Sequence, residues 1–382
     1  MKKRVSILGS TGSIGLQTID VAKKLDIEII GIAAYSNAEL LKKQIDEINP
    51  QIACIMDKEK YNLLKDYSKK TKIVTGIEGL IEVATIEAAD IVLNSVVGII
   101  GLVPTIEAIK NKKTIALANK EALVTGGKII NKLIKDFLTN IIPVDSEHSA
   151  LFQCLVGEDI NNVKRLILTA SGGPFRGKKN NEIYNSTVDE VLKHPTWSMG
   201  KKITVDSATL INKGFEVIEA MWLFEMNINK IDVIVHPQSI IHSMVEFNDN
   251  SIKAQLSNPD MRLPIEYALT YPERQKSVIE QLDFAKVSSL TFERPDIETF
   301  KLLKLSYQCA EKGEGYPIVL NGANEVAVQQ FLEGKIKFGM IADVIESALN
   351  DYQGNKIENI EDILIVDNWA RRYVIEKLER WF

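Results

Sequence analysis

Three carboxylates stand where they could bind one metal ion together. Asp145 and Glu147 directly follow the apolar run 141–144, and Glu216 lies in the segment 206–216. Ligands of open α/β sheets bind beyond the carboxyl ends of the strands, so the first two acids lie where chemistry is expected. Carboxylate oxygens suit Mg²⁺ or Mn²⁺, whereas only four histidines and three cysteines in the whole chain argue against zinc. The alternative is that Asp145 only caps a helix that follows it.

The segment 206–216 predicts a helix with a polar side. Spacings of three and four residues place Asn212, Lys213 and Glu216 on one face. An amide, a cation and a carboxylate would then project together. Taken alone, the same pattern also fits a solvent-exposed face with an ordinary Lys–Glu pair.

A glycine-rich turn near the N-terminus predicts a dinucleotide site. The apolar run 5–8 leads into GSTGSIG, in which glycine recurs every third residue, and a helical pattern follows. Strand, glycine turn and helix N-terminus is the order that a dinucleotide pyrophosphate needs. Backbone N–H groups and the hydroxyls of Ser10, Thr11 and Ser13 can donate to phosphate oxygens. A purely structural turn is the alternative.

The end of the second predicted strand indicates which dinucleotide is bound. Residues 33–37 read Ala-Ala-Tyr-Ser-Asn, without the acidic residue that would bind the ribose hydroxyls of NAD. Ser36 and Asn37 could accommodate a 2′-phosphate, so NADP is favoured, although no Arg or Lys stands there.

The strands and helices that position these residues can be predicted from the sequence pattern. Over residues 5–144, apolar runs alternate with helical patterns. Such alternation predicts a parallel, doubly wound, Rossmann-like sheet. Helical spacing is present at 38–48 and 104–109. The predicted strands are residues 5–8, 27–33, 52–56, 91–93, 114–117 and 141–144.

Beyond residue 143 the pattern changes to that of an α+β domain with a mixed or antiparallel sheet. A helix is expected at 149–156, and strands are expected at 165–169, 233–235, 240–247 and 251–256. From residue 300 onward, helical spacing dominates, including 323–332 and 340–349. We therefore expect an N-terminal nucleotide-binding domain at 1–145, a central α+β catalytic domain at 146–270, a linker at 271–296 and a C-terminal helical domain at 297–382.

Residues 171–200 are rich in Gly, Pro, Lys and Asn and carry Trp197. This composition predicts a lid that closes over substrate, because an exposed loop rarely keeps a large apolar ring without something to cover. A plain surface loop is the alternative.

Composition excludes several classes of protein. The 382 residues carry 46 basic and 51 acidic side chains, for a net charge of −5, without a long basic run, so nucleic acid is not an expected partner. No apolar run is long enough to span a membrane, and no signal peptide is expected. Three cysteines far apart in the chain fit a reducing, cytoplasmic location.

Long ordered motifs resemble the 1-deoxy-D-xylulose 5-phosphate reductoisomerase family from the first strand to the C-terminal helices. They are GSTGSIG, ALANKEALV, PVDSEHSA, TASGGPFR, HPTWSMGKKITVDSATLINKGFEVIEA, HPQSIIHSMVEF, NPDMRLPIEYAL and NGANEVAV. The resemblance implies conversion of 1-deoxy-D-xylulose 5-phosphate to 2-C-methyl-D-erythritol 4-phosphate in the non-mevalonate route to isoprenoids. It also implies NADPH, a divalent cation (Mg²⁺ or Mn²⁺, with Co²⁺ as a further candidate) and a homodimer.

The resemblance also implies roles for individual residues. Asp145, Glu147 and Glu216 resemble the metal ligands, in agreement with the reasoning from the carboxylates. Lys120 resembles the lysine that reaches the substrate beside the nicotinamide, and Lys120 and Glu147 are the expected catalytic groups. The expected substrate contacts are Ser146, Glu147, Ser171, His194, Trp197, Ser207, Asn212, Lys213 and Glu216. The expected NADPH contacts are Thr11, Gly12, Ser13, Ile14, Ser36, Asn37, Asn119, Glu121, Met199 and Gly200.

Several alternatives stay open. Fragmentation followed by re-aldolisation and a direct ketol shift both yield an aldehyde that hydride can reduce. A plain NADP-linked dehydrogenase, or a non-catalytic NADPH sensor, would have no use for the three carboxylates.

Two departures from the family pattern stand out. Tyr35-Ser36-Asn37 replaces a Gly-Lys-Asn-like turn, which leaves the strength of the NADPH preference open. Gly322 stands where Ala is usual. Outside the site, His236 and His242 are expected to be structural or interfacial, and Glu219 and Glu225 are expected to face solvent.

Overall fold

The computed structural model describes residues 2–195, 197 and 199–381. The chain forms two compact units. Unit 1 comprises Met1–Ala122, Ile130–Phe152 and Asp260–Glu280, and unit 2 comprises Leu123–Ile129, Gln153–Pro259 and Gln281–Phe382. Neither unit is one continuous stretch of sequence.

Unit 1 contains a seven-stranded, all-parallel sheet in the order β4-β3-β2-β1-β5-β6-β7. The order reverses beside β1, which makes the sheet doubly wound and confirms the predicted Rossmann-like architecture. The strands are β1 (Arg4–Leu8), β2 (Glu28–Ala34), β3 (Ile52–Ile55), β4 (Lys72–Thr75), β5 (Ile91–Asn94), β6 (Thr114–Leu117) and β7 (Ile141–Pro143).

One of these strands was not among those expected. β4 is a four-residue strand at the edge of the sheet, and Ile73 is its only buried side chain. A short strand that buries one side chain gives almost no periodic signal, so the sequence pattern misses it.

Helices of unit 1 pack on the sheet around a continuous apolar core that includes Ile7, Ile32 and Leu93, all fully buried. Helix α4 contacts β1, β2 and β3, while α12 packs against α1, β6 and β7. The helical elements are α1 (Ser13–Lys24), α2 (Ala38–Ile48), α3 (Lys58–Leu64), α4 (Gly76–Thr85), η1 (Ile99–Gly101), α5 (Leu102–Lys110), α6 (Lys120–Phe137), α7 (Ser146–Leu155) and α12 (Arg262–Thr270). The middle of α6 and the last residues of α7 group with unit 2.

Unit 2 contains a four-stranded sheet in the order β11-β10-β8-β9. Strand β10 pairs antiparallel with both β8 and β11, and β8 pairs parallel with β9, so the sheet is mixed. The strands are β8 (Val163–Ala170), β9 (Ile231–Val235), β10 (Ile241–Phe247) and β11 (Ile252–Leu256).

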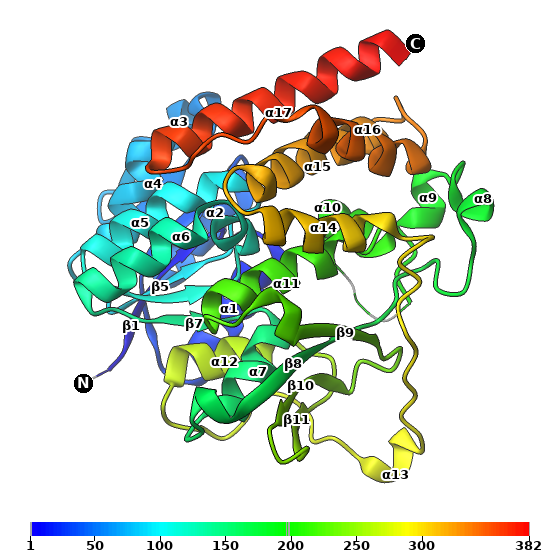
Figure 1. Cartoon of the computed structure of the whole chain (residues 1–382). Helices are drawn as coiled ribbons and strands as arrows, with labels where there is room; N and C mark the ends of the chain where they lie inside the picture. Colours follow the sequence, from blue (N-terminus) through cyan, green and yellow to red (C-terminus); the bar gives the residue numbers. More distant parts are fainter. Residues whose placement is uncertain (1, 196, 198, 382) are drawn as a thin grey trace. The chain divides into compact units, whose positions relative to one another are not determined.

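The C-terminal part of unit 2 is helical, as predicted. Helix α15 is buried along most of its length, because it contacts α14, α16 and α17. Figure 1 shows α15 and α17 side by side. The helical elements of unit 2 are η2 (Ile160–Asn162), α8 (Asn180–Ile183), α9 (Val188–Val191), α10 (Lys201–Ala208), α11 (Ile211–Leu223), η3 (Ile228–Lys230), α13 (Phe284–Val287), α14 (Lys301–Lys312), α15 (Tyr316–Leu332), α16 (Phe338–Asp351) and α17 (Ile360–Trp381).

The segment around the expected linker divides differently in the structure. Residues 260–280 group with unit 1, since the apolar side chains of α12 are buried there. Residues 281–299 carry the short α13, and Glu293 pairs with Val235 at the end of β9.

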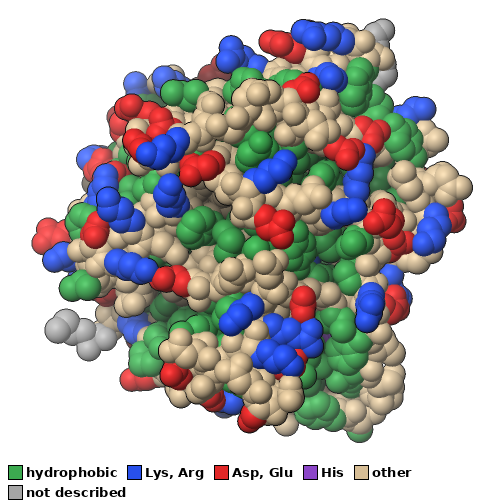
Figure 2. All heavy atoms as spheres, viewed as in Figure 1, with side chains coloured by type: hydrophobic (Ala, Val, Ile, Leu, Met, Phe, Trp, Pro, Cys, Tyr) green, Lys and Arg blue, Asp and Glu red, His purple; other side chains and the backbone are tan. Residues whose placement is uncertain are grey.

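Charged side chains of both signs are interspersed over the face drawn in Figure 2, in keeping with 46 basic and 51 acidic residues. Among the described residues, no helix combines the length and the apolar character that crossing a membrane requires.

Candidate active site

The glycine loop joins β1 to α1 in unit 1. Gly9 has a φ of +92°, which side-chain-bearing residues rarely adopt, and the Gly12 N–H donates to the Gly9 carbonyl at 3.0 Å. A Cβ atom at Gly15 would overlap that same carbonyl, so glycine lets the helix pack against the loop. Helix α1 begins at Ser13, and its first backbone N–H groups are left for a ligand.

The predicted phosphate-contacting residues of this loop differ in accessibility. Gly12 and Ser13 are exposed, and Thr11 and Ile14 are half-buried. Ser10 is fully buried, and its hydroxyl donates to Gln44 Oε1 at 2.7 Å. The expectation that Ser10 donates to a phosphate is therefore wrong, because this hydroxyl ties the loop to α2.

At the carboxyl end of β2, Ser36 and Asn37 are exposed. Asn37 caps α2, since its Oδ1 accepts from the Leu40 N–H at 3.1 Å. Its amide N–H groups remain the side-chain donors available to a ligand.

Lys120 lies just after the end of β6 and contacts Asp145. Lys120 is 6% exposed and forms an ion pair with Asp145, with Nζ and Oδ2 2.5 Å apart. The preceding Asn119 accepts from the Ala122 N–H and donates to Val96 O at 2.8 Å and to Glu121 Oε2 at 3.0 Å. Asn119 and Glu121 thus fix the start of α6, from which Lys120 projects.

The acidic pair lies at the end of β7. Helix α7 begins at Ser146 rather than at residue 149, so Glu147 lies in its first turn. A carboxylate oxygen of Asp145 and one of Glu147 lie within 4.8 Å of each other. Asp145 Oδ1 also accepts from the Ser146 N–H at 3.1 Å, so this residue both caps the helix and belongs to the cluster. The Ser146 hydroxyl donates to Glu147 at 2.5 Å.

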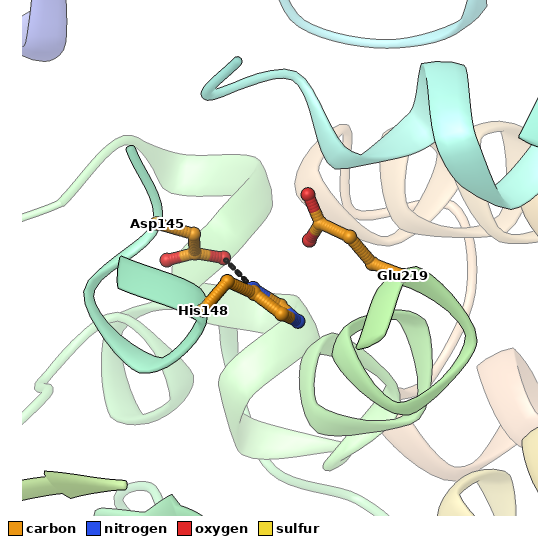
Figure 3. A group of neighbouring side chains, drawn as sticks. All are labelled: Asp145, His148 and Glu219. Atoms are coloured by element: carbon orange, nitrogen blue, oxygen red, sulfur yellow. Dashed lines mark ion pairs between the residues drawn. The ribbon is translucent and has the colours of Figure 1, made fainter. Parts of the chain in front are cut away.

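Sequence reasoning missed His148 at this place. Its ring is fully buried, and Figure 3 shows its Nδ1 directed at the Asp145 carboxylate, 3.9 Å away. The three-residue spacing on α7 was the available signal.

The predicted polar face of unit 2 exists, but it lies on the second of two helices. Leu210, in the left-handed conformation, separates α10 from α11, so the segment 206–216 is not one helix. On α11, Asn212 Nδ2 donates to Glu216 Oε1 at 2.6 Å, and Lys213 pairs with Glu216. Lys213 and Glu216 are 4% and 1% exposed, which excludes the solvent-exposed alternative.

Ser171 and His194 lie side by side in unit 2, and Gly173 packs against Ser207. Ser171 Oγ lies 3.1 Å from His194 Nε2, and a Cβ atom at Gly173 would lie only 2.7 Å from the Ser207 carbonyl oxygen. The Trp197 N–H donates to His194 Nδ1 at 3.0 Å, so the proton of a neutral ring is on Nε2. Burial lowers the pKa of His194, in keeping with this neutral form.

Residues 171–200 contain the short helices α8 and α9, and residues 196 and 198 lie outside those described. The Trp197 ring lies 6.3 Å from that of His242, which interacts with Ser257 Oγ at 2.9 Å. Met199 is half-buried and Gly200 is exposed just before α10.

Two further buried acids were not recognised in the sequence. Asp206 is 2% exposed and accepts from Asn324 Nδ2 at 2.8 Å and from Lys202 Nζ at 2.9 Å. Glu219 is fully buried, so the expectation that it faces solvent is wrong. Glu219 lies on α11 (Figure 3), and its burial depends on residues distant in sequence, so it cannot be read from local spacing.

Comparison with known proteins covers the whole chain. A model described as 1-deoxy-D-xylulose 5-phosphate reductoisomerase matches residues 5–127, and models of its C-terminal domain match residues 141–224 and 256–373. The 1-deoxy-D-xylulose 5-phosphate reductoisomerase of Lachnospira eligens is 54% identical, with 99% of this chain and 100% of the relative aligned. The chain belongs to the 1-deoxy-D-xylulose 5-phosphate reductoisomerase family.

Solved structures of reductoisomerases agree with this assignment. The enzyme of Zymomonas mobilis in complex with NADPH has a TM-score of 0.92 and 40% identity, covering 99% of this chain and 100% of that one. A reductoisomerase in complex with NADPH, fosmidomycin and magnesium has a TM-score of 0.94 and 39% identity, covering 99% and 98%.

Proposed function

We propose that the chain converts 1-deoxy-D-xylulose 5-phosphate to 2-C-methyl-D-erythritol 4-phosphate with NADPH and a divalent cation, in the non-mevalonate route to isoprenoids. The observation that carries this proposal is the close pair Asp145 and Glu147 at the end of β7, in the same unit as the glycine loop. A plain dehydrogenase needs the loop but not the paired carboxylates. Family membership over the full length selects the substrate.

NADPH fits the nucleotide edge of unit 1. The loop offers N–H groups at the start of α1, and the exposed Ser36 and Asn37 offer neutral donors where an acid would repel a 2′-phosphate. Asn119 and Glu121 follow the carboxyl end of β6, and Met199 and Gly200 of unit 2 complete the proposed contacts. The NADPH bound in the Zymomonas mobilis structure supports this choice.

A divalent cation fits the carboxylates. Asp145 and Glu147 present hard oxygen atoms within 4.8 Å of each other, and we propose Glu216 as the third ligand. Magnesium, which is present in three solved reductoisomerase structures, is the first candidate, with Mn²⁺ and Co²⁺ as others. When bound there, the cation would polarise the substrate's oxygens and stabilise negative charge that develops on them.

Phosphate recognition is proposed for Ser171, His194, Ser207, Asn212 and Lys213. Lys213 supplies the one positive charge, and the others supply hydroxyl, imidazole and amide donors. Several neutral donors around one buried cation suffice for a dianion, because charge-assisted hydrogen bonds are about twice as strong as neutral ones. Ser146 and Glu216 complete the proposed substrate contacts. Trp197 is proposed as part of a lid that covers the bound substrate.

Lys120 and Glu147 are the proposed catalytic groups. Lys120 is an ammonium donor at the carboxyl end of β6, from which it can polarise the carbonyl that accepts hydride. Glu147 already accepts the Ser146 proton in a hydrogen bond, which marks it as the group that moves protons between substrate oxygens. These roles serve the fragmentation and the ketol-shift routes equally.

We also propose a cytoplasmic homodimer. The family resemblance supports the dimer, and three buried free cysteines fit a reducing compartment. Light scattering after size exclusion would measure the oligomeric state.

The deciding experiment follows NADPH oxidation with 1-deoxy-D-xylulose 5-phosphate, with and without EDTA, and identifies the product. We expect metal-dependent oxidation and a branched tetritol phosphate. Full activity in EDTA, or an unbranched product, would overturn the proposal.

A further inference from the structure

Tyr35 is an exposed aromatic side chain on the nucleotide edge of unit 1. We infer that its ring is the surface on which the adenine of the dinucleotide stacks, an inference that rests on the proposed NADPH-dependent function.

The position of Tyr35 is fixed by the glycine loop. The N–H groups of Gly9 and Ser10 both donate to the Ala33 carbonyl, at 2.9 and 2.8 Å. Gln44 of α2 in turn donates to Ser10 O at 2.9 Å. The loop that takes the pyrophosphate is thus bonded directly to the strand end two residues before Tyr35. Tyr35 lies about twenty residues after Gly15, where dinucleotide-binding sheets place the residue that meets the adenosine ribose.

The backbone at Tyr35 is held while its ring lies in solvent. Its carbonyl accepts from the Asp57 N–H at 2.9 Å, which ties the turn to the end of β3. The side chain is nevertheless 70% exposed. Within the described part of the chain, Tyr35 has no ring contact and no side-chain hydrogen bond. An aromatic ring on a fixed backbone, left uncovered beside the nucleotide edge, is a preorganised stacking surface.

The residues after Tyr35 explain why a stacking contact matters here. Ser36 and Asn37 carry no charge, and Asn37 Oδ1 is already used to cap α2. Neutral donors bind a 2′-phosphate more weakly than a Lys or Arg would. Stacking on adenine, by contrast, strengthens NADPH and NADH equally. The turn therefore supplies general affinity through Tyr35 and only modest selection through its neighbours.

Binding titrations separate the ring from the hydroxyl and from the phosphate. In Tyr35→Ala, dissociation constants for NADPH and for NADH should both rise about tenfold, as expected for loss of one base-stacking contact. Tyr35→Phe keeps the ring and should bind both as the unmodified chain does. Reduced nicotinamide mononucleotide, which lacks adenine, should bind equally to all three. Calorimetry measures these constants without turnover.

Tyr67→Ala is the matched control, because Tyr67 is also an exposed tyrosine of unit 1 but donates its hydroxyl to Asp46 at 2.7 Å. It should leave dinucleotide affinity unchanged, and Tyr35→Ala should unfold at the temperature of the unmodified chain.

Unchanged NADPH and NADH affinity in Tyr35→Ala would overturn the inference. A loss of NADPH affinity alone, reproduced by Tyr35→Phe, would also overturn it, since the hydroxyl would then be bonding the 2′-phosphate. Failure of the unmodified chain to bind NADPH would instead contradict the proposed function.

Discussion

Gly322 on α15 lies so close to Asp367 on α17 that a Cβ atom at position 322 would be 2.8 Å from Asp367 Oδ1. Asp367 is 4% exposed, and its other oxygen accepts from Arg371 Nε at 2.6 Å. Arg371 also pairs with Glu325 of α15 at 2.5 Å. Glycine at position 322 therefore leaves room for a partly buried ion pair between the two helices.

Replacing Gly322 by Ala should destabilise unit 2. Alanine normally favours a helix over glycine by about 1 kcal/mol. Overpacking against Asp367 and Ala370 costs about 1–3 kcal/mol, so the steric cost should win. Denaturant unfolding measures the change. In a double-mutant cycle with Asp367→Ala, the double variant should lose less unfolding free energy than the sum of the losses in the two single variants. Strict additivity would show that the contact with Asp367 is not the cause.

The same carboxylate should give a defined pH dependence. Burial raises the pKa of Asp367, although the hydrogen bond from Arg371 opposes the rise. Because its pKa is raised, the folded chain holds the Asp367 proton more tightly than the unfolded chain does. The resulting gain in unfolding free energy is complete at low pH. It is lost as pH rises through the folded pKa, from about pH 4 upward.

Asp367→Asn removes this titration. The unfolding free energy of the parent chain should therefore fall relative to that of Asp367→Asn as pH rises across this window. Parallel pH profiles for the two chains would contradict the assignment.

Much of unit 1 could be predicted from sequence, because each strand but one buries several apolar residues and because glycine has a specific steric task in the loop. β4 could not, since Ile73 is its only buried side chain. In unit 2, spacing predicted that Asn212, Lys213 and Glu216 share a face. It could not predict that Lys213 and Glu216 are buried, because burial depends on residues distant in sequence that pack against α11. The burial of Asp206 could not be predicted for the same reason, since its hydrogen-bond donor Asn324 lies on α15.

His194 should respond to phosphate. Burial lowers the pKa of this imidazole in the ligand-free chain, and a phosphate dianion beside Nε2 should raise it by stabilising the cation. The histidine Cε1 proton resonances, assigned with His194→Gln, report this pKa with and without inorganic phosphate. Sodium chloride at matched ionic strength should leave the value low. An unchanged pKa in saturating phosphate would place the phosphate elsewhere.

Asn324 should act as a positioning residue. Its amide donates to the buried Asp206, which directly precedes Ser207, so Asn324→Ala removes a bond that holds the end of α10. We expect a loss of about 1–3 kcal/mol in unfolding free energy and a higher KM for substrate with a smaller change in kcat. Asn321→Ala is the matched control, because Asn321 is equally buried on α15 but donates to Glu325 at 3.0 Å. It should lose stability and keep KM; a raised KM in both variants would mean that the effect is general loosening of α15.

Glu216→Gln tests the metal assignment. Glutamine keeps an acceptor for Asn212 but removes the charge that pairs with Lys213 and that would hold the proposed cation, so turnover should fall about a hundredfold or more. The Mg²⁺ concentration for half-maximal activity should rise, whereas the NADPH dissociation constant, measured by calorimetry, should stay the same. Glu246→Gln is the control, since Glu246 is a buried, ion-paired acid on β10, and its loss should change stability without changing the Mg²⁺ requirement. If Glu216→Gln weakened NADPH binding as much as it lowered turnover, the carboxylate would bind the cofactor and not the metal. Loss of a residue that binds only the cation should not change the NADPH dissociation constant.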